Sequence, residues 1–360
     1  MRLGINVRFV DAPVTGVQRF AREVVPLLLE SAECVLLAPN GAAVPEEWRA
    51  HAPVVSGSLR GHAWEQLELP RRARAASCDV VLHMSGTAPL HGGRDVMVVH
   101  DVLPLTHPHW FAPRFARWYR FVVPRAAARC ACVITVSSAS RDELLRTLAI
   151  DARKVVVVSQ GVAPFAPASA DAVRRARHIF DLPGSFVLTV GAGDARKNLA
   201  FLGGVARRWR AQDATAPPFV AVGDAAGHVV GRAGVPPELR ALGRVSDAEL
   251  AALYTAAAAF AYASTAVGFG RPPLEAMACG APAVVADSPT AREVANGEAR
   301  LLPLEERAWI DALRAAVAEP AEERATRARR IAARFTWSDA AAGVLAACRR
   351  AFDNAERFAA

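Results

Sequence analysis

Lysine is nearly missing from this sequence of 360 residues, which carries its positive charge on arginine. Lys154 and Lys197 are the two lysines, although Lys and Arg together number 43 and the formal net charge is +8. A composition rich in arginine and alanine reflects genome bias as well as function. A basic surface attracts nucleic acid, anionic bilayers or diphosphates, and its charge does not distinguish between them. A surface of solvated arginines with no specific partner explains the positive net charge equally well.

Several other signals are absent. The six cysteines form no Cys-x-x-Cys pair and no compact disulfide framework, so we expect reduced core residues. No basic run interleaved with aromatics is present, so no nucleic acid is expected as a partner. The chain opens directly on a short apolar strand and contains no run of eighteen apolar residues, which predicts a cytoplasmic location. Its length and 52% hydrophobic content favour two domains over one.

Short apolar strands alternate with helical or loop segments along both halves of the chain. Such alternation predicts an α/β fold with doubly wound parallel sheets, in which ligands collect at the carboxyl ends of the strands. A segment rich in proline and alanine, residues 163–170, predicts the domain boundary. Strands are expected at residues 2–9, 34–38, 80–82, 96–99, 130–137, 155–158, 186–190, 219–222, near 242 and up to 263.

Two helix starts carry the spacing of a capping box, in which a serine is followed three residues later by a glutamate. Ser140 precedes Glu143, and Ser246 precedes Glu249. Both are predicted to begin helices.

The most informative stretch is residues 260–287, which read as a buried strand, a turn with two glycines, and a helix that runs to Gly280. Gly268 and Gly270 allow a tight turn, and a proline at 272 or 273 suits the first helical turn. Backbone N–H groups and the helix dipole make such a turn an anion site. Glu275, near the start of this helix, is on its own equally well explained as a surface carboxylate that offsets the dipole.

Residues 267–284 read VGFGRPPLEAMACGAPAV, and this segment resembles the signature of the family 4 glycosyltransferases. These are retaining enzymes of the GT-B fold, in which two Rossmann-like domains face a central cleft. The usual signature has two glutamates, and the first falls on Val267 here. The resemblance implies that Gly268, Phe269, Gly270 and Arg271 bind the sugar-nucleotide donor and that Glu275 binds its ribose hydroxyls. It also covers residues 64–66 and 83–89, which we place on acceptor-side loops.

Three further segments match the same family. Residues 98–105, VVHDVLPL, place His100 and Asp101 near the donor sugar, although a lone histidine at a strand end is more often structural. Residues 193–199, GDARKNL, place Arg196 and Lys197 on the donor diphosphate. Residues 191–196 begin like the Gly-x-Gly-x-x-Gly fingerprint of dinucleotide-binding proteins. That interpretation is disfavoured because position 196, where the third glycine should be, is arginine.

Two weaker matches complete the donor site. Gly16 aligns with the family's first glycine loop, although it could simply shape a helix entry. Val245 aligns with a residue whose backbone contacts the nucleotide base. The catalytic set is therefore predicted as His100, Arg196, Lys197 and Glu275.

The resemblance implies an acceptor-side domain over residues 1–165, a nucleotide-sugar domain over 166–335, and a helix over 336–360 that crosses back to the first domain. It implies retaining transfer of a hexosyl unit, with GDP-mannose as the first donor to test, to a glycan or lipid-linked acceptor in surface polysaccharide or lipopolysaccharide synthesis. The sequence contains no Asp-x-Asp pair, so no metal or cofactor is expected. The positive net charge of the chain is compatible with peripheral contact with the inner face of an anionic membrane.

Val267 leaves two other functions open. The chain could be a silent donor-binding or scaffolding module, since the missing carboxylate would ordinarily accept hydrogen bonds from sugar hydroxyls. It could also be a sugar-nucleotide epimerase of the same fold, which would act on the donor without an acceptor. A glycosidase mechanism needs a second carboxylate, which position 267 does not supply.

Overall fold

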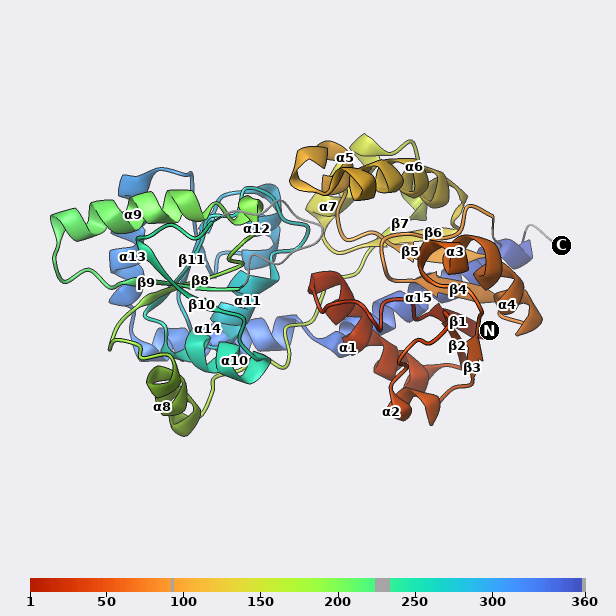
Figure 1. The fold of residues 1–360 in the computed structure, drawn as a ribbon, viewed down its shortest axis with the longest axis horizontal. Helices are drawn as coiled ribbons and strands as arrows, with labels where there is room; N and C mark the ends of the chain where they lie inside the picture. Colours follow the sequence, from red (N-terminus) through yellow and green to blue (C-terminus); the bar gives the residue numbers. More distant parts are fainter. Residues whose placement is uncertain (92–93, 224–233, 358–360) are drawn as a thin grey trace. The chain divides into compact units, whose positions relative to one another are not determined.

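The computed structural model describes residues 1–91, 94–223 and 234–357, which form two compact units. Unit 1 comprises Met1–Thr106, Arg114–Gly161 and Trp337–Ala360. Unit 2 comprises His107–Pro113 and Val162–Thr336. The chain therefore passes into unit 2 after Gly161 and returns to unit 1 for its last helix. The two units are described separately below (Figure 1).

Unit 1 is built on a seven-stranded parallel sheet with the order β3-β2-β1-β4-β5-β6-β7. β1 lies between β2 and β4, so that Leu3 pairs with Cys34 on one side and Val80 on the other. The strand order reverses between β1 and β4, which marks a topological switch point. The strands are β1 Leu3–Asn6, β2 Cys34–Ala38, β3 Val54–Ser56, β4 Val80–His83, β5 Asp95–Val98, β6 Cys132–Thr135 and β7 Val155–Val157.

Helices cover both faces of this sheet because successive strand residues point to opposite sides. Val96 and Val98 pack with the cluster that contains α1 and α15, whereas Met97 packs with α6. The helical elements are α1 Gly16–Ser31, α2 Glu46–Arg49, α3 Gly61–Ala63, the π-helical turn η1 Trp64–Glu68, α4 Leu69–Ala75, α5 Leu103–Thr106, α6 Pro113–Arg129, α7 Ser138–Thr147, the 3₁₀ turn η3 Ala152–Lys154 and α15 Trp337–Arg357.

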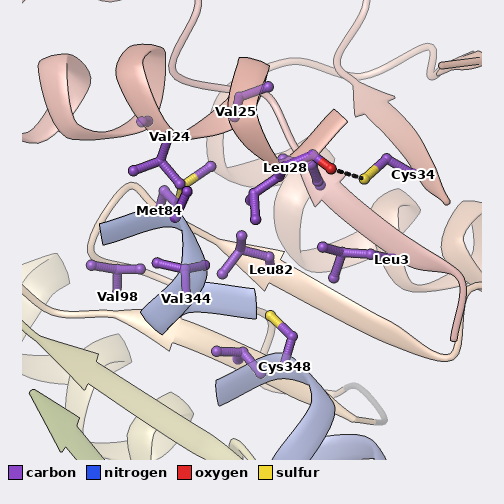
Figure 2. Packing of buried hydrophobic residues seen from close by; sticks show 14 of the residues in the cluster. Leu3, Val24, Val25, Leu28, Cys34, Leu82, Met84, Val98, Val344 and Cys348 are labelled. Atoms are coloured by element: carbon purple, nitrogen blue, oxygen red, sulfur yellow. Dashed lines mark hydrogen bonds between the residues drawn. The ribbon is translucent and has the colours of Figure 1, made fainter. Parts of the chain in front are cut away.

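Helices α1 and α15 meet over one face of the sheet, although they lie at opposite ends of the chain. Figure 2 shows Leu28 of α1 and Val344 and Cys348 of α15 packed over Leu82 of β4. All four side chains are fully buried. Val98 of β5 extends the same cluster, which makes the C-terminal helix part of the core of unit 1.

Unit 2 repeats the pattern with a six-stranded parallel sheet in the order β10-β9-β8-β11-β12-β13. The order reverses between β8 and β11, so this sheet also has a switch point. Its strands are β8 Val187–Val190, β9 Phe219–Val222, β10 Leu239–Gly243, β11 Ala259–Tyr262, β12 Ala283–Ala286 and β13 Arg300–Leu302. These two sheets confirm the predicted doubly wound α/β fold.

Helices α9 and α13 cover one face of the second sheet with Trp209 and Trp309, both buried against the strands. Helices α10 and α11 pack against each other, and α11 also packs on β11 and β12. The helical elements of unit 2 are η2 Pro108–Trp110, α8 Ala170–Ile179, the 3₁₀ turn η4 Ala195–Lys197, α9 Leu199–Gln212, α10 Asp247–Ala256, α11 Arg271–Ala278, α12 Pro289–Ala295, α13 Glu306–Val317 and α14 Ala321–Arg334.

The two predicted capping boxes have different outcomes. Ser246 and Glu249 form one at the start of α10. The Ser246 hydroxyl accepts the backbone N–H of Glu249, and the Glu249 carboxylate accepts the backbone N–H of Ser246. The box predicted at Ser140 is wrong, because α7 begins earlier. Ser137 is its N-cap and accepts the backbone N–H of Ser140, which lies inside the helix. Three of the four residues 137–140 are serines, so the local sequence offered several caps of equal quality.

The six cysteines are free, as predicted. Burial raises the pKa of the Cys34 thiol to about 11 and that of Cys279 to about 12, so both remain neutral at ordinary pH. Within residues 1–91, 94–223 and 234–357, no helix is long and apolar enough to cross a membrane.

Candidate donor site

The candidate site lies in unit 2, where the loops after β8 and β11 leave the sheet. These are the neighbouring strands at the switch point, and ligands of open parallel sheets bind in the crevice outside such strand ends. The two loops are joined by a hydrogen bond from Thr265 N to the Arg196 carbonyl oxygen, 3.0 Å long. The structure thus brings the Arg196–Lys197 segment and the glycine turn together.

Arg196 is held by Asp194 in a tight 3₁₀ turn. The Asp194 carboxylate accepts the backbone N–H of Arg196 at 2.9 Å and the side-chain Nη2 at 2.8 Å. Burial alone would raise the pKa of Asp194, but the hydrogen bonds and charge of Arg196, with the charge of Lys197, lower it below its usual range. The guanidinium is therefore neutralised and fixed in direction.

The same tetrapeptide, Asp-Ala-Arg-Lys, occurs a second time at residues 151–154 of unit 1. Asp151 again accepts the backbone N–H of Arg153, and the guanidinium again pairs with the carboxylate. The turn is therefore encoded locally, and its presence alone does not indicate a site. The surroundings differ, because Arg153 is 87% exposed and Arg196 only 18%.

Lys197 supplies the free positive charge of the site. Its Nζ donates to the Tyr262 hydroxyl at 2.6 Å and lies 4.8 Å from the centre of the same ring. In the described part of the chain, no carboxylate forms an ion pair with this ammonium. Gly191, with φ +108°, makes room for the lysine stem, because a Cβ there would lie 2.7 Å from Lys197 Cγ. The cation is thus positioned by a phenol and a glycine and stays available to an anion.

The glycine turn after β11 leads into α11. Gly270 has φ +86° and is the N-cap of α11, with no side chain capping the helix. As predicted, prolines occupy the first turn, at Pro272 and Pro273. Proline has no N–H, so the donors of this turn are confined to its earlier residues, 268–271.

Glu275 and Arg271, both assigned to the donor by resemblance, pair with each other inside α11. Arg271 donates from Nη2 to Glu275 Oε1 at 2.8 Å, and the Tyr254 hydroxyl donates to Oε2 at 3.3 Å. Burial and the Glu275 charge raise the pKa of Tyr254 well above its usual value, which keeps it a neutral donor. The predicted ribose contact of Glu275 remains a prediction.

Val267 lies where the family signature has its first glutamate, on the wall of a small apolar pocket of about 20 Å³. Phe269, Met277 and Val294 line the same pocket. The Phe269 ring is buried and meets Phe335 edge-on, with ring centres 5.8 Å apart. The lining of this pocket does not include Asp194, Arg196 or Lys197.

Val245 lies between β10 and α10 and is half-buried. The remaining predicted residues belong to unit 1. Gly16 is exposed as the first residue of α1, where Thr15 and Gln18 form a capping box. His100 follows β5, is buried, and packs edge-on against Phe20 with ring centres 5.2 Å apart. Asp101 accepts the Leu103 N–H at 3.1 Å, a local turn contact.

Sequence reasoning missed the residues that position the predicted ones. Asp194 could have been found, since an aspartate two residues before an arginine forms such turns. Tyr262 and Tyr254 gave no sequence signal, because each acts on a partner that is distant in sequence. Gly191 was noticed only as part of a rejected dinucleotide fingerprint, because its contact with Lys197 is specific to this packing. Among the described residues, no group of three His, Cys, Asp or Glu side chains could hold a metal ion.

Two family models match the chain. The model of Glycosyltransferase Family 4 matches residues 14–164, and that of Glycosyl transferases group 1 matches residues 184–319. The second match contains both loops of the candidate site. In both halves the chain is therefore similar to the family 4 glycosyltransferases.

Curated relatives of this chain include two bacterial proteins. The O-antigen chain mannosyltransferase RfbU of Salmonella typhimurium is 29% identical over 233 residues, which cover 63% of this chain and 62% of that protein. The O-antigen chain mannosyltransferase B of Escherichia coli is 29% identical over 219 residues, 58% of this chain and 57% of that protein. The chain thus spans less than two thirds of the length of these relatives.

Solved structures show the fold of this chain. Anabaena HepE in complex with UDP-glucose has a TM-score of 0.70 at 17% identity, covering 99% of this chain and 100% of that one. WaaG, a glycosyltransferase involved in lipopolysaccharide biosynthesis, has a TM-score of 0.64 at 13% identity. The match covers 92% of this chain and 94% of that one. The fold is therefore GT-B.

We expect Lys197→Ala to weaken the binding of nucleoside diphosphates by about ten- to a hundredfold, because one hydrogen bond to a charged group contributes about 1.5–3 kcal/mol. Lys197→Arg should restore little, since its planar fork does not fit the place of the ammonium beside Tyr262. Titration calorimetry with UDP and GDP measures both.

Lys154→Ala is the matched control, since it removes the other lysine from the same tetrapeptide in unit 1. Equal weakening by the two alanine variants would contradict the assignment of Lys197.

Proposed function

We propose that this chain is a retaining hexosyltransferase that uses a nucleoside diphosphate sugar. The observation that carries the proposal is the Lys197 ammonium, which Tyr262 holds at the switch point of unit 2 and which forms no ion pair with a carboxylate among the described residues. Negative charge grows on the leaving diphosphate as the anomeric bond breaks, and preorganised donors favour that change. Lys197 and the turn amides fulfil this role, and Arg196, already paired with Asp194, acts as a fixed secondary donor.

The proposed step is a transfer on one face of the sugar. The acceptor hydroxyl oxygen forms a bond to the anomeric carbon as the bond from that carbon to the diphosphate oxygen breaks. The proton of the hydroxyl passes to the departing phosphate. No protein nucleophile is needed, and Val267 offers none. The roles of His100 and Asp101 near the sugar, of Val245 at the base and of Gly16 at the phosphate rest on the family match alone.

The proposed donor is GDP-mannose and the proposed acceptor a glycan or lipid-linked sugar of a bacterial surface polysaccharide or lipopolysaccharide. The O-antigen mannosyltransferases support this choice, although the chain matches only part of their length. We also propose that no metal takes part, because the sequence has no Asp-x-Asp pair and Lys197 supplies a cation at the diphosphate.

Calorimetry in EDTA with GDP-mannose, UDP-glucose and the dTDP- and ADP-glucose analogues tests donor and metal together. We expect one sugar nucleotide to bind in the micromolar range, with an affinity that added magnesium does not change. Binding that appears only with magnesium would contradict metal independence. Binding of no donor would contradict the transferase and favour the silent scaffolding module that Val267 allows.

Val267→Glu tests whether this position affects the binding of the donor's sugar. The variant places a carboxylate on an apolar wall, where it can accept hydrogen bonds from sugar hydroxyls. We expect the ratio of Kd between the nucleoside diphosphate and its sugar form to change about tenfold or more. Val267→Gln is the uncharged control of the same shape. If the ratio stays at the wild-type value in both variants, the position does not contact the sugar.

We further propose a cytoplasmic enzyme that contacts an anionic membrane through α6. This helix contains five arginines and no acidic residue. Arg114, Arg117, Arg120 and Arg125 are exposed, and the exposed Phe121 ring lies under Arg125 at 4.2 Å. Basic residues near an anionic bilayer contribute about 1 kcal/mol each, and an exposed aromatic ring suits its interface.

Flotation with vesicles containing phosphatidylglycerol tests this contact. Arg117→Glu/Arg120→Glu should lose salt-sensitive flotation, because the outward face of α6 then carries mixed charge. Arg174→Glu/Arg175→Glu, on exposed positions of α8, makes the same change of net charge elsewhere. Equal loss in both double variants would show that net charge, and not α6, is responsible.

A further inference from the structure

A buried glutamine lies beside the point at which the chain leaves unit 1. Gln160 comes shortly after β7, just before the chain passes into unit 2, and only 4% of its surface is exposed. Glutamine is mostly exposed in proteins, because burying an amide costs free energy unless it forms hydrogen bonds. The contacts of this amide therefore indicate its role.

The amide of Gln160 contacts the ring of His100. Gln160 Nε2 lies 3.5 Å from His100 Nδ1, although the two residues are 60 positions apart in the chain. The amide nitrogen can only donate, so Nδ1 carries a lone pair in this arrangement. The proton of the neutral ring is then on Nε2, because the bond that one imidazole nitrogen makes decides the state of the other.

The orientation of the amide follows from its surroundings. Gln160 Oε1 is buried and has no hydrogen-bond partner among the described residues. Turning the amide over would let Oε1 accept a proton from Nδ1, but it would leave two buried N–H groups without a partner instead of one. In protein interiors an unpaired carbonyl oxygen is less rare than an unpaired N–H group. The orientation with the N–H toward His100 is therefore preferred.

A closed ring of contacts holds the imidazole and the amide together. His100 packs edge-on against Phe20 of α1, and Phe20 packs against Trp337, with ring centres 5.2 and 6.1 Å apart. Trp337 begins α15 and lies against Gly161, where a Cβ would come within 2.6 Å of the indole. Gly161 follows Gln160, so the contacts return to their starting point. Each of the two polar groups is thus held by packing as well as by the other.

The backbone on both sides of Gln160 is also fixed. Before it, Val158 N donates to the Thr135 carbonyl oxygen of β6 at 2.8 Å. After it, Val162 N donates to the Phe335 carbonyl oxygen at 3.1 Å, which joins the outgoing and returning segments of the chain. The amide is therefore presented to His100 by backbone that the fold already holds in place.

We propose that Gln160 is a positioning residue that fixes the tautomer and the orientation of His100. Its N–H keeps Nδ1 unprotonated, so the ring stays neutral and has Nε2–H as its donor. The consequence for catalysis rests on the proposed transferase function, in which His100 lies near the donor sugar. A donor that is fixed in advance stabilises the reacting oxygens without having to reorient during the reaction.

The chemical shifts of the His100 ring nitrogens report the tautomer without donor or turnover. They are measured by NMR on the full chain with isotope-labelled histidine, at about pH 8, where an ordinary histidine is neutral. The signals that disappear in His100→Asn assign the ring. We expect an unprotonated Nδ1 and a protonated Nε2 in wild type. An Nδ1–H ring, or one that exchanges between the two tautomers, overturns the proposal.

Gln160→Glu reverses the polarity of the contact, because a carboxylate accepts and cannot donate. Nδ1 should then gain a proton and move to the shift of a protonated nitrogen. Gln160→Leu removes the donor, so both ring nitrogens should move toward the shifts of mixed tautomers. Gln212→Glu adds the same charge at an exposed position of α9 and should leave the His100 shifts at wild-type values. Unchanged shifts in the two Gln160 variants overturn the proposal, and Gln160→Glu, which keeps the shape, decides if Gln160→Leu does not fold.

Release of GDP from GDP-mannose, with methyl α-mannoside as acceptor, distinguishes this inference from the proposed function. Gln160→Leu should lower kcat about tenfold or more and leave the donor KM within about threefold, because the contact acts on His100 and not on the diphosphate. An unchanged kcat, or a loss confined to KM, contradicts a positioning role in transfer. Transfer by a wild type with an Nδ1–H ring refutes this inference alone. The predicted tautomer in a wild type that transfers nothing refutes the proposed transfer and leaves the assignment of Gln160 standing.

Discussion

The donor site depends on one constraint, the placement of a single ammonium group between two strands. Lys197 follows β8 in the chain, but its Nζ is held by Tyr262, the last residue of β11. The hydroxyl accepts a hydrogen bond and the ring stabilises the cation without neutralising it. A carboxylate in that place would cancel the charge. Because the loops after the two strands are also joined through Thr265 and Arg196, the cation and the glycine turn keep a fixed relation.

Two kinds of charged group occur near the candidate sites. Some are buried ion pairs that hold each other in place, and one is a lysine whose partner is a hydroxyl. Asp194 with Arg196 and Glu275 with Arg271 are pairs that lie mostly out of water, and each member fixes the other. In unit 1, Glu65 fixes Arg8 in the same way, and burial would raise the pKa of Glu65 if its donors and nearby charges did not lower it to about 2. Lys197 differs because its partner is a neutral phenol. An arginine-rich sequence thus uses a lysine where a small, unpaired cation is needed.

Much of the fold could be predicted from the sequence because it depends on local pattern. Alternating apolar strands, the glycine turn and the prolines of α11 are readable from neighbouring residues. The repeated Asp-Ala-Arg-Lys turn shows the limit of such reading, since identical residues form identical turns in a surface loop and in the site. What distinguishes them is Tyr262 and Gly191, contacts that only the sheet order creates. The contacts around His100 join α1, α15 and the segment after β7, and no spacing in the sequence indicates them.

The donor diphosphate is proposed to bind at the switch point of unit 2. Hydrogen exchange measured by mass spectrometry, with and without the nucleoside diphosphate that binds in calorimetry, tests it directly. We predict slower exchange in peptides that contain residues 191–198 and 264–271, and no change in peptides that contain residues 61–69 of unit 1. Bound nucleotide with unchanged exchange in both unit 2 loops would contradict the account.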